Sequence, residues 1–318
     1  MYDQYNRKID YLRISLTDRC NLHCKYCQPD VMQHVAHSEI LRYEEIIRVC
    51  KAAVVLGITK FKITGGEPLL RKGCAEFICQ LKQLEGVKQV TLTTNGTFLT
   101  QFLPALIDAN VDCVNVSLDT MDAKAYHNLT GGVLKSVLQG LEALCAAKVP
   151  FKINCVPLAG IDIDNILNLL ALADKYKAPL RFIELMPLAC NGSLEGVSGS
   201  RLRCLLAQKG LAVTQDTNTY GNGPATYYRV PGYAMPIGFI EPLHNKFCAA
   251  CNRVRLTSVG LLKPCLYSSD GLDVRSLLRS KASIKELQDA MQKTIFAKPA
   301  GHKFEEQPAG FNMSAIGG

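Results

Sequence analysis

Long apolar runs are absent from this chain of 318 residues. No segment reaches the roughly 18 uncharged apolar residues that a membrane-spanning helix needs. The first residues, MYDQYNRKIDYLRISL, lack the apolar core of a secretory signal. These absences argue against membrane and secreted classes, so we expect a cytoplasmic protein with no membrane partner. Short repeats and low-complexity blocks are also absent, and the composition is that of an ordinary globular protein.

Dense runs of lysine or arginine are absent too, although the formal net charge is +8. The positive residues are scattered along the chain. Such a distribution fits a polyanionic ligand in one pocket, a face for nucleic acid, or surplus lysine on the surface. Charge alone leaves these three explanations open.

Cysteine, in contrast, is abundant, with 14 residues. In a chain with no recognisable secretory signal, metal binding or catalysis explains many cysteines better than disulfides do. Eight of them are spread through apolar segments, where a free cysteine usually packs as a small hydrophobic side chain. The other six form two tight groups, Cys20, Cys24 and Cys27, and Cys248, Cys251 and Cys265.

Strand-like and helix-like segments alternate along the first part of the chain. The expected strands cover residues 10–16, 58–63, 87–93, 111–118, 149–156 and 180–185. The expected helices cover residues 43–56, 73–84, 101–108, 133–147 and 163–176. This alternation predicts βαβ units with a parallel sheet and right-handed crossovers. Six units suit either an incomplete barrel or an open doubly wound sheet, and both place ligands at the C-terminal ends of the strands.

The alternation stops near Leu188. A Gly- and Ser-rich loop over residues 191–200 is followed by an expected helix at 202–208 and strand-like pieces at 225–230 and 235–240. We therefore expect a core domain over residues 1–187. A smaller C-terminal region over residues 188–318 would carry the second cysteine group and the Gly317-Gly318 tail.

The first cysteine group has the spacing C-x3-C-x2-C and follows the first expected strand. Thiolates are soft ligands for zinc, copper(I) or iron–sulfur clusters. Structural zinc usually takes four closed ligands, and His23 is a poor fourth because it lies beside Cys24. Three cysteines can hold a [4Fe-4S] cluster whose fourth iron stays open for a substrate or cofactor. The spacing therefore predicts such a cluster, with zinc as the alternative.

The run CNLHCKYC, with Tyr26 before the third cysteine, resembles the signature of the radical S-adenosylmethionine (SAM) enzymes. The segment Thr64-Gly-Gly-Glu-Pro68 supports the resemblance, which implies that it binds the amino group of SAM. Its glycines allow backbone to approach a ligand closely, and Glu67 can accept from an ammonium. An ordinary strand-to-helix turn is the alternative. A phosphate-binding P-loop is excluded, because no Gly-Lys-Ser/Thr follows.

The second cysteine group, Cys248-x2-Cys251-x13-Cys265, is another set of three thiolates. A second cluster with an open iron is one interpretation, and a zinc knuckle with His244 as the fourth ligand is the other. The run between these cysteines contains two arginines, at positions 253 and 255. In extended backbone they share one face, where two guanidiniums suit a phosphate or a base. Solvated surface arginines are the alternative.

Nearly the whole chain resembles the GTP 3′,8-cyclase family of the radical SAM superfamily. The motifs that carry this resemblance are LRISLTDRCNLHCKYC, KITGGEPLLR, TTNG, NVSLD, FKINCV, LRFIELM, FCAACNRVRLTSVGLLKPCL and the final Gly-Gly. The resemblance implies an incomplete (βα)6 TIM-like barrel with a smaller C-terminal region. It also implies a lyase that converts GTP to (8S)-3′,8-cyclo-7,8-dihydroguanosine 5′-triphosphate, in the first step of molybdenum cofactor (molybdopterin) biosynthesis.

Residue roles follow from the same resemblance. Cys20, Cys24 and Cys27 would hold a first [4Fe-4S] cluster, and Cys248, Cys251 and Cys265 a second. The expected SAM contacts are Tyr26, Gly66, Ser117 and Met186. The expected GTP contacts are Arg13, Lys62, Thr93, Lys152, Arg253, Val254 and Arg255. Lys62 departs from the family, which usually has arginine there, so it keeps the charge but loses the planar fork.

The implied cofactors are two [4Fe-4S] clusters and SAM. The implied partners are GTP, an external one-electron reductant and the next enzyme of the pathway, cyclic pyranopterin monophosphate synthase, with a homodimer possible and no nucleic acid. The Gly317-Gly318 tail is expected to reach the active site. A peptide-modifying radical SAM maturase with an auxiliary cluster is the alternative enzyme, although maturases usually have more C-terminal cysteines. An RNA-binding iron–sulfur or zinc protein is the alternative without catalysis.

Overall fold

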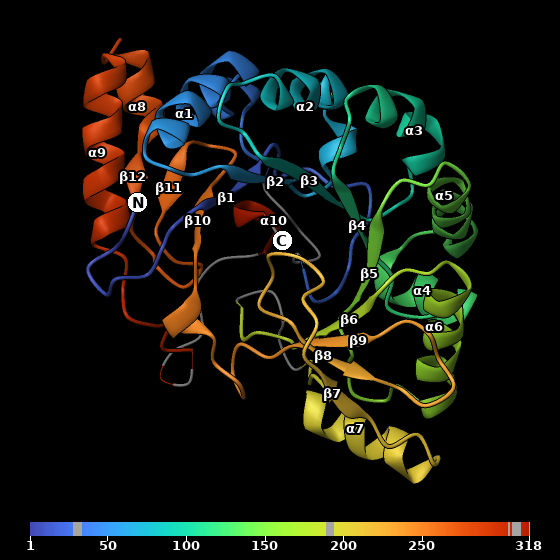
Figure 1. Ribbon diagram of the computed structural model, residues 1–318. Coiled ribbons are helices and arrows are strands. Elements are labelled where there is room, and N and C mark those ends of the chain that lie inside the picture. The colour runs from blue at the N-terminus through green and yellow to red at the C-terminus, as the bar shows by residue number, and fades with distance from the viewer. Residues whose placement is uncertain (28–33, 189–193, 305, 307–312, 318) are drawn as a thin grey trace.

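The computed structural model describes residues 1–27, 34–188, 194–304, 306 and 313–317, and a single curved sheet dominates it (Figure 1). The strands are β1 Tyr11–Ser15, β2 Lys60–Thr64, β3 Gln89–Thr94, β4 Cys113–Ser117, β5 Phe151–Cys155, β6 Leu180–Ile183, β7 Thr214–Asp216, β8 Thr226–Arg229, β9 Ile237–Ile240, β10 Arg253–Leu256, β11 Leu261–Lys263 and β12 Leu272–Asp273. The α-helices are α1 Tyr43–Val55, α2 Cys74–Lys82, α3 Leu99–Asp108, α4 Ala123–Thr130, α5 Leu134–Ala146, α6 Ile163–Lys175, α7 Gly199–Gln208, α8 Val274–Arg279, α9 Ile284–Phe296 and α10 Met313–Ile316.

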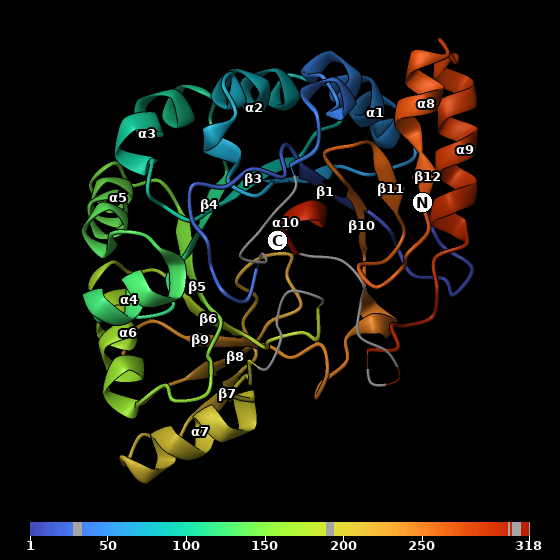
Figure 2. The ribbon, with the colours of Figure 1, turned by 180° about the vertical axis from the view of Figure 1, so that it is seen from behind.

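Strands β1 to β6 are parallel and adjacent in chain order, which confirms the six expected strands. The expected helices are confirmed as α1, α2, α3, α5 and α6, with ends that differ by a few residues. Helices α1 to α6 all lie on the convex face of the sheet (Figures 1 and 2). A doubly wound sheet would have helices on both faces, so that alternative is wrong and the barrel-like arrangement is confirmed.

The C-terminal region extends this sheet at both edges. Strand β10 pairs in parallel with β1, and β9 pairs in parallel with β6. Antiparallel strands then continue outward on each side, giving the order β12-β11-β10-β1-β2-β3-β4-β5-β6-β9-β8-β7. One sheet therefore contains both parts of the chain. The division into residues 1–187 and 188–318 stays a prediction. Residues 191–193 of the expected loop and Gly318 lie outside the described residues.

The hydrophobic core lies between the sheet and the outer helices. Leu12 and Ile14 of β1 are fully buried there, while Arg13 between them points to the other face, as the two-residue period of a strand requires. Helix α5 buries one stripe at helical spacing: Leu134, Val137, Leu141 and Leu144. The outward faces of the strands thus build the core, and their inward faces are free to carry polar side chains. No α-helix among the described residues is long and apolar enough to cross a membrane.

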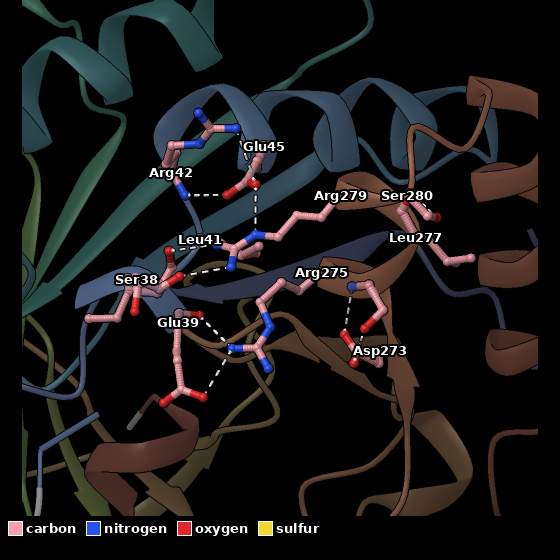
Figure 3. Close-up of polar contacts among 12 residues, drawn as sticks. Ser38, Glu39, Leu41, Arg42, Glu45, Asp273, Arg275, Leu277, Arg279 and Ser280 are labelled. Carbon is pink, nitrogen blue, oxygen red and sulfur yellow. Dashed lines mark hydrogen bonds and ion pairs between the residues drawn. The ribbon is translucent and has the colours of Figure 1, made fainter. Parts of the chain in front are cut away.

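Helices α8 and α9 pack beside α1 (Figure 1), and a polar network joins α1 and α8 (Figure 3). The buried Glu45 carboxylate accepts from the backbone N–H of Arg42 at 2.7 Å and from Nε of Arg279 at 3.2 Å. Arg279 also donates to the carbonyl of Ser38 at 2.8 Å. Burial opposes ionisation of Glu45, but the N–H of Arg42 and the Arg279 guanidinium hold its pKa below the ordinary 4.5.

We expect Arg279→Ala to lower the free energy of unfolding by about 1–2 kcal/mol, because it leaves the buried Glu45 carboxylate with fewer partners. A carboxylate with a lowered folded-state pKa stabilises the fold above its unfolded pKa and loses that effect as pH falls. The difference between parent and variant should therefore shrink below about pH 4.5, as urea denaturation can measure. Lys285→Ala, which breaks an exposed pair with Asp289 on α9, is the control. A pH-independent difference would contradict this account.

Candidate active site

A cavity of about 290 Å³ opens inside the curve of the sheet, where the inward side chains of the strands meet. Its lining includes most of the predicted site residues: Arg13, Cys20, Cys24, Tyr26, Cys27, Lys62, Gly66, Thr93, Ser117, Lys152, Met186, Arg253 and Arg255. The sequence motifs, which lie as far apart in the chain as Arg13 and Arg255, thus converge on one space.

The first cysteine loop is held by backbone contacts to the Thr64–Pro68 segment. The N–H of Gly66 donates to the carbonyl of Thr17 at 2.7 Å, and the N–H of Glu67 donates to the carbonyl of Arg19 at 2.8 Å. A Cβ at Gly66 would clash with the Arg19 carbonyl. Gly66 is therefore needed for the close approach of two backbone segments, one of which leads directly into Cys20.

The side chain of Glu67 adds hydrogen bonds that hold this segment in place. The buried carboxylate accepts from the Leu69 N–H at 3.0 Å, from the Thr94 hydroxyl at 2.8 Å and from the Asn95 N–H at 2.7 Å. Burial raises the pKa of Glu67 to about 7. Both carboxylate oxygens are already engaged by protein donors. These three bonds tie the segment after β2 to the end of β3, and the expectation that Glu67 also receives an ammonium stays a prediction.

The three thiols of the first group face the cavity. Cys20 Sγ accepts from the Leu22 N–H at 3.4 Å and from the side-chain amide of Asn95 at 3.7 Å. Burial, followed by the nearby charges of Cys27, Asp119 and Cys20, raises the pKa of Cys24 well above its ordinary value. Such thiols stay protonated unless a metal binds them. Their position and chemistry fit a cluster that is exposed to the cavity.

Tyr26 and Asp119 form the next part of the wall. The Tyr26 hydroxyl donates to Asp119 Oδ2 at 2.8 Å, and the other carboxylate oxygen accepts from the Val156 N–H at 2.8 Å. Burial raises the pKa of Asp119 to about 6. Ser117, at the end of β4, and Met186, after β6, line the same space. The four residues predicted to contact SAM therefore share one cavity with the first cysteine group.

Buried cations line up across neighbouring strands deeper in the cavity. The strand register pairs Arg13 with Arg255 on one side and with Lys62 on the other. Like charges directly opposite each other destabilise a sheet. Burial and the neighbouring cations Arg253 and Arg181 lower the pKa of Arg13 to about 10. The same two causes, burial and nearby Arg181 and Arg13, lower the pKa of Lys62 well below its ordinary value. A bound polyanion would relieve this repulsion.

Arg181 belongs to this cationic set, although the sequence reasoning did not select it. It lies on β6, is 6% exposed, and donates from Nε to Asn154 Oδ1 at 2.9 Å and from Nη2 to Asn115. Two neutral amides therefore hold the guanidinium without cancelling its charge. The signal that could have found Arg181 is a charged residue within an apolar strand, because a buried charge needs a partner.

Lys152 and Val254 differ from the simple expectation. Lys152 lines the cavity and donates to the carbonyl of Tyr220, from a loop of the C-terminal region. Val254 is fully buried in the hydrophobic core behind the sheet. Because Arg253 and Arg255 face the cavity, the side chain between them must face the other way. The prediction that Val254 contacts the nucleotide stays a prediction, and such a contact would have to come from its backbone.

The second cysteine group lies near the two arginines, and its three residues are not among the described residues that line the cavity. Cys248 begins the 3₁₀ turn Cys248–Ala250, and Cys265 follows β11. Burial opposes ionisation of Cys251, but Lys298 and Arg253 lower its pKa. Three thiols among buried cations fit an anionic iron–sulfur cluster.

Nδ1 of His244, the proposed fourth ligand of a zinc knuckle, is bonded to the Glu184 carboxylate, which leaves Nε2 available to a metal, so this bond does not exclude the zinc alternative. No three His, Cys, Asp or Glu side chains among the described residues converge closely enough to hold one metal ion. The ligands of a four-iron cluster need not converge in this way, because each thiolate binds a different corner.

The C-terminal tail enters the cavity side of the sheet. Helix α10 lies inside the curve in both views (Figures 1 and 2). Arg255 donates from Nη1 to the carbonyl of Gly317 at 2.7 Å. A side chain at Gly317 would clash with the Thr64 hydroxyl, and the φ of +80° there also favours glycine. The part of the tail that the structure describes is thus held next to the cations of the site.

Two family models together match most of the chain. The model described as "Radical SAM superfamily" matches residues 14–173, and the one described as "Molybdenum Cofactor Synthesis C" matches residues 178–304. Among solved structures, SuiB of Streptococcus suis bound to S-adenosylmethionine superimposes with a TM-score of 0.64 and 15% identity, covering 97% of this chain and 77% of that chain. The structure of anSMEcpe with bound AdoMet gives a TM-score of 0.61 and 19% identity over 92% and 82% of the two chains. At these identities the likeness shows the fold alone, and it confirms the radical SAM fold.

Curated relatives match over the full length. The GTP 3′,8-cyclase of Thermodesulfovibrio yellowstonii is 40% identical, and that of Heliobacterium modesticaldum is 39% identical, each over 100% of both chains. The GTP 3′,8-cyclase of Moorella thermoacetica is 40% identical over the same share. With identities at this level along the whole length, and with both family models matched in order, the chain belongs to the GTP 3′,8-cyclase family of radical SAM enzymes.

Proposed function

We propose that this protein is a radical SAM lyase that converts GTP to (8S)-3′,8-cyclo-7,8-dihydroguanosine 5′-triphosphate, the first step of molybdenum cofactor biosynthesis. The observation that carries the proposal is one cavity with two different ends. One end has the three thiols of Cys20, Cys24 and Cys27, and the other has buried cations whose mutual repulsion a polyanion would relieve. Full-length identity to the cyclases supports the choice of GTP.

The first cysteine group would hold a [4Fe-4S] cluster, and Cys248, Cys251 and Cys265 would hold a second. When bound, the first cluster and SAM would supply a 5′-deoxyadenosyl radical able to take hydrogen from C3′ of the GTP ribose. The protein positions the reactants: Tyr26, Gly66, Ser117 and Met186 line the SAM end of the cavity. Positioning of this kind can account for a large part of the rate.

The nucleotide would lie against the cationic end. Arg13, Lys62, Lys152 and Arg181 suit the phosphates, because guanidinium and ammonium groups make charge-assisted hydrogen bonds to them. Thr93 lines the same cavity, and Val254 lies on β10 between Arg253 and Arg255. Arg253 and Arg255 line the cavity and lie on the strand that follows Cys251, so the guanine would approach the second cysteine group near these two side chains. Lys62 supplies charge without the bidentate geometry of arginine.

The remaining partners belong to the same proposal. An external one-electron reductant would deliver electrons to the clusters, and cyclic pyranopterin monophosphate synthase would use the product as its substrate. We infer a cytoplasmic location and no nucleic-acid partner, with a homodimer as the assembly that the family resemblance favours. The core domain would end near residue 187, with the C-terminal region supplying the second cluster and the tail.

The direct test is anaerobic incubation of the reconstituted protein with SAM, a reductant and GTP, followed by mass analysis. We expect the cyclised nucleotide, and a rate of 5′-deoxyadenosine formation that rises when GTP is added. Iron analysis should give about eight irons per chain for two four-iron clusters, with little zinc. If the rate of 5′-deoxyadenosine formation did not change when GTP was added, and no cyclised product formed, the cyclase proposal would be refuted. That result would favour the peptide maturase.

A further inference from the structure

Lys298 is a buried lysine that none of the steps above uses. It follows α9, is 2% exposed, and ranks among the largest fully buried side chains. Removing an ammonium from water costs several kcal/mol unless charge and hydrogen bonds replace the lost hydration. Within the described ranges, no carboxylate forms an ion pair with Lys298. The cost of burying the Lys298 ammonium must therefore be offset by hydrogen bonds and by another negative charge.

The hydrogen bonds of Lys298 join the two chain segments that carry Cys251 and Cys265. Nζ donates to the carbonyl of Arg253 at 2.8 Å, two residues after Cys251. It also donates to the carbonyl of Pro264 at 2.6 Å, directly before Cys265. An ammonium has three donors. After these two bonds, the charge lies close to the Cys251 thiol.

The third cysteine, Cys248, is linked to the backbone of residues 299–300 through the side chain of Arg7. The buried Arg7 donates from Nη1 to the carbonyls of Cys248 and Ala300, both at 2.9 Å, and from Nη2 to the carbonyl of Pro299 at 2.6 Å. Asp3 holds Arg7 through Nε at 2.6 Å. Residues 298–300 are thus bonded, directly or through Arg7, to the segments that carry all three cysteines. Among the described side chains of these residues, only Lys298 bonds to both the Cys251 segment and the Cys265 segment.

We propose that Lys298 is a positioning residue of the second cysteine group, which fixes Cys251 relative to Cys265 and supplies the buried positive charge for the cluster held there. This inference rests on the proposed second [4Fe-4S] cluster. Charge and hydrogen bonding near the sulfurs are the means by which a protein sets the reduction potential of such a cluster. A nearby cation favours the reduced form, which carries one more negative charge. Removing the cation should therefore lower the reduction potential.

The test compares Lys298→Met, which keeps the length but removes the charge, with Lys298→Arg, which restores the charge. Both are made in a Cys24→Ala background, where only the second cluster can assemble, and iron content and a redox titration followed by electron paramagnetic resonance are recorded. We expect Lys298→Met to lower the ratio of reduced to oxidised cluster at a fixed potential by about tenfold, equal to about 59 mV for a one-electron couple. Loss of the cluster in Lys298→Met with retention in Lys298→Arg would also support the proposal.

Two controls separate this role from general support of the fold. Lys298→Met in a Cys251→Ala background should leave the iron and spectrum of the first cluster unchanged. Lys82→Met, which removes a partly buried lysine paired with Asp112 far along the chain, should leave both clusters unchanged.

An unchanged potential and iron content in Lys298→Met would overturn the inference, as would equal loss from both cysteine groups with a lowered melting temperature. If the Cys24→Ala parent itself held no iron, the proposed second cluster would fail first, and Lys298 would have no such role.

Discussion

Replacing Cys251 by alanine is expected to abolish formation of the cyclised nucleotide while cleavage of SAM continues. Cys251 precedes the strand that carries Arg253 and Arg255 and is not among the described cavity-lining residues, whereas the first cysteine loop lines the cavity with Tyr26 and Gly66. Losing one thiolate of the second group leaves the first group, and the residues around SAM, in place. Product should fall by at least about 100-fold, since mispositioned substrates lose about that much even without loss of binding. Anaerobic assays of 5′-deoxyadenosine and of cyclised product measure the two reactions separately.

The matched variant is Cys24→Ala, which removes the central thiolate of the first group. It should abolish both reactions, because no SAM is cleaved without that cluster. Cys204→Ala, at an exposed cysteine on α7, should change neither. If Cys251→Ala still made cyclised product at the parent rate, the second group would have no part in the reaction. If it lost SAM cleavage as completely as Cys24→Ala, the two groups would not act separately.

The parallel core could be predicted from the sequence because its signals are local. Each strand is a short apolar run, and each helix has apolar residues at helical spacing along one face. The short connections then indicate that consecutive strands lie next to each other in the sheet. The edge strands are different. Strand β10 pairs with β1 across more than 240 residues, and no local pattern indicates that Leu12 faces Val254. The C-terminal region was therefore expected as an appendage, although it completes both edges of the barrel sheet.

The site was predictable where a motif presents its chemistry directly. Three thiols at close spacing need no structure to suggest a cluster. Lys298 and Arg7 gave no such signal, because their acceptors are carbonyl groups that could belong to any residue type. For Val254, strand alternation already indicates a side chain on the face opposite the two arginines, so only its backbone can adjoin the cavity.

Arg181→Met is expected to weaken binding of GTP about 10- to 100-fold. Hydrogen bonds to charged groups contribute about 1.5–3 kcal/mol, and 1.4 kcal/mol corresponds to a factor of ten in affinity. Methionine fills similar space and leaves the amides of Asn115 and Asn154 free to solvate the site. A ligand that binds the folded protein raises its melting temperature, and the rise grows with the ratio of the free ligand concentration to its Kd. Melting temperatures with GTP, GDP and guanosine therefore measure the loss, which should be largest for the triphosphate.

The pH dependence of binding gives this prediction a second readout. Burial and the Arg181 charge lower the pKa of Lys62, so above that pKa the free protein must take up a proton to bind the polyanion. GTP affinity should fall as pH rises, and in Arg181→Met the fall should move to higher pH, because Lys62 loses a repelling neighbour. Arg48→Met, on the outer face of α1, should keep both the affinity and the pH profile of the parent. Equal losses for GTP and guanosine, or an unshifted profile, would show that Arg181 supports the strand and does not contribute its charge to the nucleotide.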